Sequence, residues 1–254
     1  MHPILFHWGS TPISSFSLIL NLAAFLGVGL WIWQSKRSGL EFSSEALMKT
    51  GLLALIGAWV GAKSFFFVLN PDRLDGWVSL WQGGLVFYGG LGIGSLVLWI
   101  GLRTQNLWHP TLLAAATPAL AYAQAIGRLG CFMNGCCHGT LCSHPWGVAF
   151  SDIHSAARPL NTPLHPTQLY ESVGLLALGS LLWVQGPRLG FRAVGRYLWL
   201  AAGLRLFTEN FRGDELRGFW GPLSSAQVIA SVLFFLGVLL DFGRLGHHKR
   251  SHEN

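Results

Sequence analysis

The fold is decided by the stretch ISSFSLILNLAAFLGVGLWIW, which runs from Ile13 to Trp33 and contains no Asp, Glu, Lys or Arg. A helix needs about 20 apolar residues to cross the hydrocarbon core of a bilayer, so this stretch is long enough to span it. The residues before it, Met1 to Pro12, lack the cationic start and small-residue cleavage site of a signal peptide, and we expect the span to remain in the mature protein. Three more stretches of similar length also lack charged side chains: Gly83–Leu102, Trp108–Gly127 and Pro222–Leu240.

Three further apolar stretches are interrupted by charged residues, and a charge at membrane depth suggests a function because it is costly to place there. They are Thr50–Leu69 with Lys63, Thr167–Gln185 with Glu171, and Val194–Glu209 with Arg196 and Arg205. The apolar residues come in unbroken blocks rather than in the alternating pattern of barrel strands, which favours helices. The sequence therefore predicts an all-α polytopic membrane protein with about seven transmembrane helices in a single integral-membrane domain, residues 1–254.

The composition agrees with a bilayer environment. Of the 254 residues 51% are apolar and only 11% are charged, whereas a soluble domain carries about 25% charged residues. The 12 Trp, 17 Phe and 32 Gly suit aromatic belts at the membrane interface and close contacts between helices. This composition argues against a soluble globule, a disordered chain, a disulfide-rich miniprotein and a nucleic-acid-binding protein.

The net charge of +6 has a topological explanation. In a soluble chain it would suggest a polyanionic partner, but Lys and Arg beside membrane helices set orientation and attract anionic lipid. The cation distribution favours an N-terminus outside and a cytoplasmic C-terminus, which places the longest loop, about Arg128 to Pro166, outside. Ten cations then lie on the inner side and six on the outer side. The inner ten are Lys36, Arg37, Lys49, Arg103, Arg188, Arg192, Arg196, Arg244, Lys249 and Arg250, and the outer six are Arg73, Arg128, Arg158, Arg205, Arg212 and Arg217.

Arg205, Glu209 and Arg212 form the first set of candidate site residues. Their spacing of i, i+4 and i+7 places all three within about 60° of one helix face. Two arginines held by one carboxylate would form a preorganised site for a lipid phosphate, because guanidinium binds phosphate through paired hydrogen bonds. The alternative is a plain ion-paired helix end, with Glu209 bridging the two arginines.

The second set is GRLGCFMNGCCHG, residues 127–139, where an apolar span is expected to end in a glycine-rich turn. Arg128 at this end either snorkels to the interface or joins the site. Three states stay open for the cysteines of this loop: small buried thiols, a disulfide with Cys137–Cys142 as the first pair to test, or a metal site. Their spacing, C-x4-C-C-x4-C, is not a zinc-ribbon pattern, and the four are Cys131, Cys136, Cys137 and Cys142.

Two more motifs add candidate residues. GGLVFYGGLGIG, residues 83–94, has the small-xxx-small spacing of ordinary helix packing and contains no Walker-type lysine. HPTQLYE, residues 165–171, is a polar start to the fifth span. In this motif Tyr170 is a candidate for the aromatic belt at the membrane interface. Glu171 is a candidate partner of the helix dipole in the first turn, and Thr167 is a candidate helix cap.

In chain order these motifs, together with RLFTENFR (205–212) and GPLSSAQ (221–227), resemble those of the bacterial phosphatidylglycerol:prolipoprotein diacylglyceryl transferases over most of the chain. The resemblance implies transfer of a diacylglyceryl group from phosphatidylglycerol to the lipobox cysteine thiol of a preprolipoprotein, with formation of a thioether and release of glycerol 1-phosphate. It also implies the bacterial cytoplasmic (inner) membrane, an active site toward the outer (periplasmic) side, and no metal or organic cofactor; it indicates no oligomeric state. The most specific pattern, GRxGxFxNGxxxG, is met by Gly127, Arg128, Gly130, Phe132, Asn134, Gly135 and Gly139.

The resemblance also implies roles for these residues. Arg128 and Arg205 would stabilise the negative charge of the phosphate leaving group as the glycerol carbon is attacked, with Glu209 positioning the arginines. Arg212 would help to hold the headgroup. Further substrate-binding residues are expected to shape the polar turn or to lie in the HPTQLYE motif: Asn134, Gly139, His165, Gln168, Tyr170 and Glu171.

The chain departs from the family pattern at the position of an acid–base residue. Tyr88 stands where the family has histidine, and tyrosine, with an ordinary pKa of about 10, is a poor base for a thiol near neutral pH. Either Tyr88 acts as a hydrogen-bond donor, or His138, and after it His165, serves as the base; both histidines also suit plain loop hydrogen bonding. Further departures are Cys131 for asparagine, Cys136 for an acidic residue and Phe16 for tyrosine.

Two other classes of function are weaker. A noncatalytic or altered-specificity paralogue that binds lipid or lipoprotein would keep the phosphate-binding arginines and lose the base, and Tyr88 is the residue that supports it. A small-solute transporter would explain charges within spans, but the chain has no paired inverted repeat with broken helices in corresponding positions.

Overall fold

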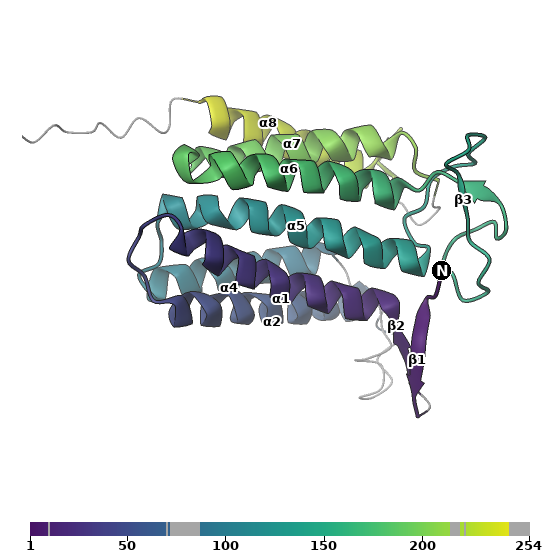
Figure 1. Ribbon diagram of the computed structural model, residues 1–254, viewed down its shortest axis with the longest axis horizontal. Helices are drawn as coiled ribbons and strands as arrows, with labels where there is room; N and C mark the ends of the chain where they lie inside the picture. Colours follow the sequence, from purple (N-terminus) through teal and green to yellow (C-terminus); the bar gives the residue numbers. More distant parts are fainter. Residues whose placement is uncertain (10, 70, 72–86, 214–218, 221, 244–254) are drawn as a thin grey trace, which may run out of the picture. The chain divides into compact units, whose positions relative to one another are not determined.

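The computed structural model describes residues 1–9, 11–69, 71, 87–213, 219–220 and 222–243 of the chain. Within these residues the fold is mostly helical, with three short two-stranded antiparallel sheets (Figure 1). The helices are α1 (Ser15–Lys36), α2 (Ser44–Leu69), α4 (Phe87–Thr104), α5 (Pro110–Asn134), α6 (Thr167–Leu189), α7 (Arg192–Glu209) and α8 (Ser225–Phe242). The paired strands are β1 (Ile4–Trp8) with β2 (Thr11–Ser14), β3 (Val148–Ala149) with β4 (Pro163–Leu164), and β5 (Phe219–Trp220) with β6 (Leu223–Ser224).

Each of the seven apolar stretches of the sequence overlaps one of these helices, which confirms the mostly helical fold class. Three of the described helices are long and apolar enough to cross a membrane by themselves: α1, residues 44–68 of α2, and α8. Helix α4 has a shorter apolar segment, residues 89–104, and residues 83–86 of the predicted third span lie outside the described residues. The count of seven spans and the single integral-membrane domain stay predictions.

The end of α5 differs from the expected end of the span. The apolar pattern stops at Gly127, whereas the helix continues to Asn134. Arg128 and Cys131 therefore lie on the last turns of a helix and not in the loop that the sequence predicts. Hydropathy shows where apolar side chains stop, but a helix continues as long as its backbone keeps its hydrogen bonds.

The end of α7 also changes the expected site. The helix ends at Glu209, so Arg212 does not share a helix face with Arg205 and Glu209, and the predicted spacing is wrong for this residue. Arg212 instead pairs through its backbone with Gly139 in an isolated antiparallel β-bridge. This pairing with a distant segment satisfies backbone groups that would otherwise extend the helix.

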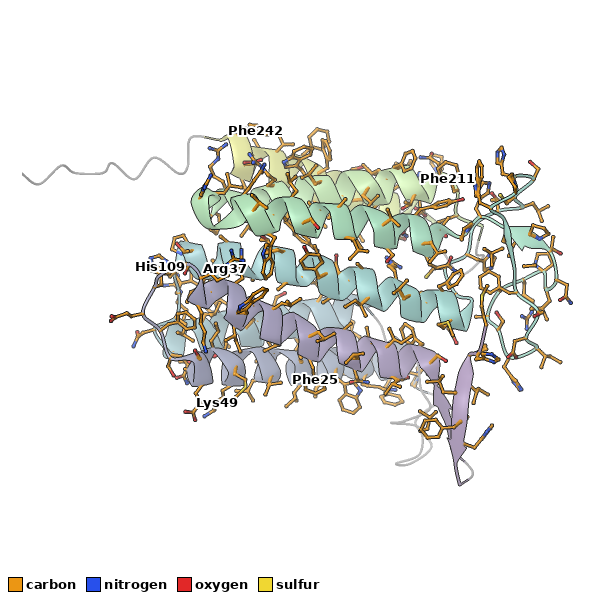
Figure 2. The ribbon with its side chains drawn as sticks, in the orientation of Figure 1. Phe25, Arg37, Lys49, His109, Phe211 and Phe242 are labelled. Atoms are coloured by element: carbon orange, nitrogen blue, oxygen red, sulfur yellow. The ribbon has the colours of Figure 1, made fainter. Side chains whose placement is uncertain are left out.

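The helices present large apolar side chains to their surroundings (Figure 2). Phe25 on α1 is 60% exposed, and Leu239 and Phe242 on α8 are each 64% exposed. Soluble monomers rarely leave so much apolar surface uncovered, whereas a bilayer covers it with acyl chains. This surface is that of a membrane protein.

Residues 35–112 form one compact unit, in which α2 packs along α4. The two backbones touch at glycines: a methyl group added to Gly61 would overlap the carbonyl oxygen of Gly89, and one added to Gly89 would overlap that of Gly61. A methyl group at Gly94 would lie 2.8 Å from Cβ of Ala58. Gly89, Gly90 and Gly94 thus serve helix packing, which confirms the interpretation of their spacing, whereas Gly92 has no neighbour within 4 Å of an added methyl group.

Residues 1–34 and 113–254 form a second compact unit, which contains α5 to α8. Its core joins three helices through Ala121 and Ala125 of α5, Leu182 of α6 and Tyr197 of α7. Helices α6, α7 and α8 lie side by side, and α7 runs antiparallel to both neighbours (Figure 1). The C-terminal ends of α5 and α7 therefore meet the N-terminal ends of α6 and α8, beside the loop of residues 135–166.

Helices α7 and α8 are in close backbone contact. A methyl group on Gly195 of α7 would lie 2.8 Å from the carbonyl oxygen of Gly237 on α8. Near the end of α8 the carboxylate of Asp241 is fully buried and accepts hydrogen bonds from Arg196 at 2.9 and 3.2 Å and from the Trp199 indole at 3.1 Å. These contacts fasten the end of α8 to the beginning of α7.

Candidate active site

A buried carboxylate, Glu171 on α6, joins two arginines from two other helices. Its Oε2 lies 2.6 Å from Nε of Arg128 on α5, and its Oε1 lies 2.5 Å from Nη1 of Arg205 on α7. The Thr208 hydroxyl donates a further hydrogen bond of 3.1 Å to Oε1. Glu171 is 4% exposed, while the arginine side chains keep 27% and 22% of their surface exposed. The carboxylate is buried, whereas both arginine side chains are partly exposed.

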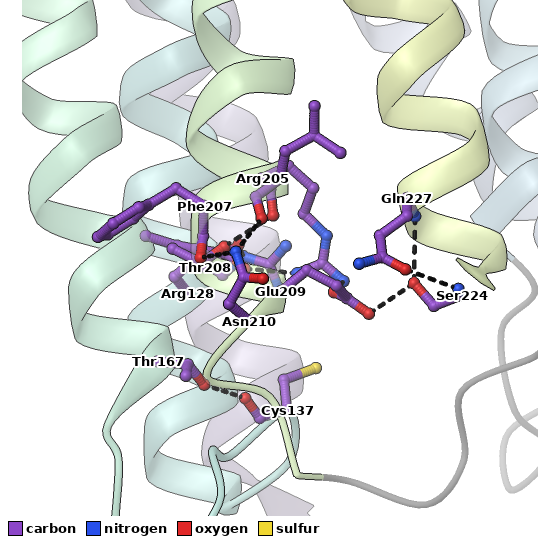
Figure 3. A network of polar contacts seen from close by, with 12 residues as sticks. Arg128, Cys137, Thr167, Arg205, Phe207, Thr208, Glu209, Asn210, Ser224 and Gln227 are labelled. Atoms are coloured by element: carbon purple, nitrogen blue, oxygen red, sulfur yellow. Dashed lines mark hydrogen bonds and ion pairs between the residues drawn. The ribbon is translucent and has the colours of Figure 1, made fainter. Parts of the chain in front are cut away.

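Glu209 and Ser224 extend this network to α8 (Figure 3). Oε2 of Glu209 lies 2.8 Å from Nη2 of Arg205, and its Oε1 accepts a 2.8 Å hydrogen bond from the Ser224 hydroxyl. Ser224 is the N-cap of α8: its hydroxyl accepts from the backbone N–H of Gln227, whose side chain accepts from the Ser224 N–H. Four helices, α5 to α8, therefore meet at one polar cluster.

The carboxylate that links two arginines is not the one that helical spacing predicts. The i, i+4 pair of Arg205 and Glu209 is present, but Glu171 is the residue that connects Arg205 to Arg128. Glu171 is thus a bridging carboxylate and more than a partner for the helix dipole. Spacing along one helix shows only local partners, whereas Glu171 is 34 residues away from Arg205 in sequence.

Arg212 adds a third cation to this cluster. Its side chain is buried, at 8% exposure, and its charge acts on both Arg128 and the Cys137 thiol. Three arginines and two glutamates leave the cluster with a net charge of +1: Arg128, Arg205, Arg212, Glu171 and Glu209.

Gly139 lies where two segments cross with no room for a side chain. Its N–H donates a 2.8 Å hydrogen bond to the carbonyl of His165, and its backbone forms the bridge with Arg212. A methyl group at Gly139 would lie 2.6 Å from the carbonyl oxygen of Phe211 and 2.7 Å from that of His165. Gly139 therefore lets the segments that carry Arg212 and His165 approach each other.

The first two residues of α6 hold the turn that follows α5. Thr167 Oγ1 donates a 2.6 Å hydrogen bond to the carbonyl of Cys137 (Figure 3), and Gln168 Nε2 donates one of 2.7 Å to the carbonyl of Cys136. Both side chains are 1% exposed. The N-cap of α6 is the preceding proline, without a side-chain cap hydrogen bond, so the predicted cap role of Thr167 is wrong.

All four cysteines are free thiols, and three of them lie together. Positive φ angles at Gly135 and Cys137, 76° and 61°, turn the chain back toward the helix end. Cys142 is not part of this group; it is buried, with its thiol 3.9 Å from the carbonyl oxygen of His144. The Cys137–Cys142 disulfide is therefore not formed. One group of the described residues could hold a metal ion, because its sulfurs all lie within 4.8 Å of one another: Cys131, Cys136 and Cys137.

The three thiols lie in a polar and positively charged environment. Hydrogen bonds with the two neighbouring thiols lower the pKa of Cys137, and the charges of Arg212 and Arg128 lower it further. Asn134, the last residue of α5, hydrogen-bonds the Cys136 thiol. The thiol group thus adjoins the arginine cluster rather than an apolar core.

His138 and His165 have different surroundings. His138 is 5% exposed; its Nδ1 donates to the carbonyl of Gly139 at 2.9 Å, and its Nε2 accepts from the N–H of Arg158 at 3.4 Å. Backbone groups thus engage both of its ring nitrogens, which favours the plain loop role. His165 Nδ1 lies 3.1 Å from the Tyr170 hydroxyl, and the two rings pack edge to face.

Two polar residues of the cluster, Thr208 and Ser224, are not among the site residues that the sequence predicts. Thr208 carries no pattern of its own. Ser224 carries a usable signal, because a serine followed three residues later by glutamine is a capping box. The side chain of Tyr88, in the first turn of α4, lies outside the described part of the chain, so its role stays a prediction.

The fold and the site together define a helical membrane protein with an arginine–carboxylate cluster suited to a phosphate group. The family model described as prolipoprotein diacylglyceryl transferase matches residues 3–242, and the chain belongs to this family. Membership in a family of transferases does not favour the noncatalytic alternative.

Individual relatives cover nearly the whole chain. A phosphatidylglycerol–prolipoprotein diacylglyceryl transferase of Clostridium tetani is 28% identical over 249 residues, which are 94% of this chain and 96% of the relative. One of Legionella pneumophila (strain Corby) is 30% identical over 258 residues, with the same coverage of 94% and 96%. One of Synechocystis is 29% identical over 253 residues, with coverage of 92% and 86%. The similarity therefore extends over full-length relatives and not over a fragment.

Proposed function

We propose that this chain transfers the diacylglyceryl group of phosphatidylglycerol to the thiol of the lipobox cysteine in a preprolipoprotein. The observation that carries the proposal is the carboxylate of Glu171 held between Arg128 and Arg205, in a chain that matches the family over residues 3–242. The relatives from Clostridium tetani and Legionella pneumophila bear the name of this activity.

The reaction breaks a carbon–oxygen bond of the lipid. The substrate thiol loses its proton to solvent, and its sulfur attacks the glycerol carbon that carries the phosphate. A thioether forms, and the electron pair of the broken carbon–oxygen bond leaves with glycerol 1-phosphate. Arg128 and Arg205 stabilise the charge that develops on this phosphate by paired hydrogen bonds. Glu171 and Glu209 hold both guanidinium groups in place before the lipid binds, so that little reorganisation accompanies the reaction.

The charge of the cluster supports a phosphodiester substrate. A phosphodiester carries one negative charge, and the three arginines and two glutamates leave a net charge of +1 to meet it. We assign the headgroup contacts to Arg212, Asn134, His165 and Tyr170. Gln168 acts through the cysteine turn, where it holds the Cys136 carbonyl, and Gly139 acts through the segments that carry His165 and Arg212, which it lets approach each other.

The orientation of the chain follows from its cations. In the unit that contains the site, Arg188, Arg192 and Arg196 lie at the end of α6 and the beginning of α7, opposite the end that carries Arg128 and Arg205. The positive-inside rule places the first end in the cytoplasm. We therefore propose seven spans in the bacterial cytoplasmic membrane, an outer N-terminus, and a site on the outer (periplasmic) side.

The test is direct. Purified protein in detergent is incubated with phosphatidylglycerol and a lipobox peptide, and mass spectrometry follows the gain of a diacylglyceryl group on the peptide. A peptide with serine in place of its cysteine is the control for attachment at sulfur. Thioether formation on the cysteine peptide alone is the expected result; its absence with a folded sample contradicts the proposed reaction.

A further inference from the structure

The reaction needs a thiolate, so a base must take the proton of the substrate thiol. His138, the first candidate for this base, is not free to do so. Both ring nitrogens of His138 are engaged by backbone groups. The family's acid–base position carries Tyr88, which is a poor base near neutral pH. His165, the second candidate, has its Nδ1 3.1 Å from the Tyr170 hydroxyl. The three neighbouring thiols offer a different way to remove the thiol proton, which needs no histidine.

The geometry of these thiols suits a tetrahedral metal ion. Zinc–sulfur bonds are about 2.3 Å long, so the sulfurs of a zinc thiolate site lie about 3.8 Å apart. The sulfurs of Cys131, Cys136 and Cys137 all lie within 4.8 Å of one another, and shifts of less than about 1 Å bring them to this spacing. Their partial exposure leaves the group open to an ion and to a substrate.

The scaffold around the thiols is already built. Cys131 is on the last turn of α5, and Thr167 and Gln168 fix the carbonyl groups of Cys137 and Cys136. Metal sites depend on such supporting hydrogen bonds, which hold the ligands in position before the ion arrives. The turn is therefore prepared for a ligand and does not depend on the ion for its shape.

The charge balance also suits a zinc site. Three thiolates and one Zn²⁺ carry a net charge of −1, and Arg128 and Arg212 lie close enough to Cys137 for their charges to act on it. The arginines thus offset the excess negative charge of the thiolates. The same two residues adjoin the proposed phosphate site, so metal and phosphate would be neighbours.

We propose that Cys131, Cys136 and Cys137 bind one Zn²⁺ and that the substrate cysteine thiol takes the fourth position. This inference rests on the proposed function. No fourth Cys, His, Asp or Glu of the described residues belongs to the group, and three protein ligands with one open position are typical of catalytic rather than structural zinc.

Ligation supplies the nucleophile. When the substrate thiol binds, its S–H bond is replaced by a sulfur–zinc bond and the proton passes to water, because a coordinating thiol is deprotonated. The sulfur then attacks the glycerol carbon, the carbon–oxygen bond breaks, and the electron pair leaves with the phosphate held by Arg128 and Arg205. No group is oxidised or reduced, and the ion remains on its three protein ligands.

The first experiment measures Zn²⁺ itself. The full-length protein, purified in detergent and stripped with a chelator, is titrated with Zn²⁺ against a chromophoric chelator, and one ion per chain is expected. Loss of a supporting residue typically weakens metal binding by about 10–100-fold, so Cys131→Ser, Cys136→Ser or Cys137→Ser is expected to weaken it by more than about 100-fold. Cys142→Ser is the matched control, because this cysteine lies outside the group, and its Zn²⁺ affinity is expected to stay unchanged.

The second experiment replaces Zn²⁺ by Co²⁺, whose sulfur charge-transfer absorption reports the number of thiolates. Addition of the lipobox peptide is expected to raise this absorption by about one third, from three thiolates to four. A peptide with serine in place of cysteine is expected to leave the spectrum unchanged. Both measurements on the unmodified protein stay decisive if a serine variant fails to fold.

The outcomes separate the zinc site from the proposed reaction. Four results would each overturn the zinc site. They are a lack of stoichiometric Zn²⁺ binding, equal Zn²⁺ affinity in all four serine variants, a Co²⁺ spectrum that does not change with the peptide, and full transfer after metal removal. Thioether formation by the metal-free protein would at the same time support the transfer reaction. Stoichiometric Zn²⁺ with a peptide-dependent spectrum but no thioether product would support the site and contradict the reaction.

Discussion

Glu171 places Oε2 2.6 Å from Nε of Arg128, so one contact between α6 and α5 aligns the two helices at the polar cluster. The same carboxylate reaches Arg205 on α7, so Glu171 joins three helices through charged groups at this end of the unit. We assign two functions to this contact: it holds helices together, and it orients guanidinium groups toward the phosphate of the proposed substrate.

Replacing Glu171 by glutamine tests the first function. Glu171→Gln removes the negative charge that both arginines face. Removal of one partner of a buried ion pair costs about 3–5 kcal/mol. We expect a cost at the lower end of this range because the arginines are partly exposed. We expect the free energy of unfolding in detergent to fall by about 3 kcal/mol. The control is Glu41→Gln at an exposed position, expected to change it by less than about 0.5 kcal/mol. Equal stability of the two variants would show that the bridge does not hold the helices.

Replacing Arg205 by glutamine tests the second function. Arg205→Gln removes hydrogen bonds to the leaving phosphate, and loss of one such donor typically lowers kcat by about 100- to 1,000-fold. The measurement is the rate of thioether formation on a lipobox peptide. Arg188→Gln, at the opposite end of α6, is the matched control and is expected to keep the rate of the unmodified protein. A rate near that of the unmodified protein in Arg205→Gln would contradict the assigned role.

Gly139→Ala probes the crossing of the loop segments. The added methyl group would lie 2.6 Å from one carbonyl oxygen and 2.7 Å from another, and such overpacking costs about 1–3 kcal/mol. We expect a lower midpoint of thermal unfolding and slower thioether formation, because Arg212 is displaced with the bridge. Gly29→Ala on α1 is the matched control: nothing lies within 4 Å of the new methyl group, and stability should rise by up to about 1 kcal/mol. Unchanged stability in Gly139→Ala would show that the segments that carry Arg212 and His165 move apart at little cost, and it would contradict the need for glycine at this crossing.

Asp241→Asn separates stability from chemistry. The fully buried carboxylate pairs with Arg196 at the end of α8 that lies away from the site, so its loss leaves a guanidinium uncompensated. We expect the free energy of unfolding to fall by about 3 kcal/mol, while folded molecules keep the transfer rate of the unmodified protein. Chemical unfolding and the peptide assay, measured on one preparation, check both expectations. A loss of rate without a loss of stability would link this end of the unit to the reaction.

The helices are predictable from the sequence because apolar runs of about 20 residues leave few alternatives to a membrane helix. Their ends are less predictable. The apolar pattern stops at Gly127 although the helix continues to Asn134, and helical spacing extends to Arg212 although α7 ends at Glu209. In the second case the backbone of a distant loop provides hydrogen-bond partners, and no local pattern contains that information.

The residues of the site are more predictable than their partners. Arg128, Glu171, Arg205 and Glu209 stand out as charges in or beside apolar stretches, but the bridge from Glu171 to Arg205 connects residues 34 positions apart. The cysteine spacing likewise matches no metal pattern, because it is a turn with two positive φ angles that brings the three sulfurs together. The residue types indicate the chemistry of the site, whereas the distances between these residues depend on the fold.

The seam between α7 and α8 limits the route of the lipid. It is fastened near one end by Glu209 and Ser224 and at the other by Arg196 and Asp241, where the backbones also touch at Gly195. At the Gly195 end there is no room even for a methyl group between the two backbones. We therefore expect phosphatidylglycerol to reach the arginines without passing between α7 and α8 at this end of the seam.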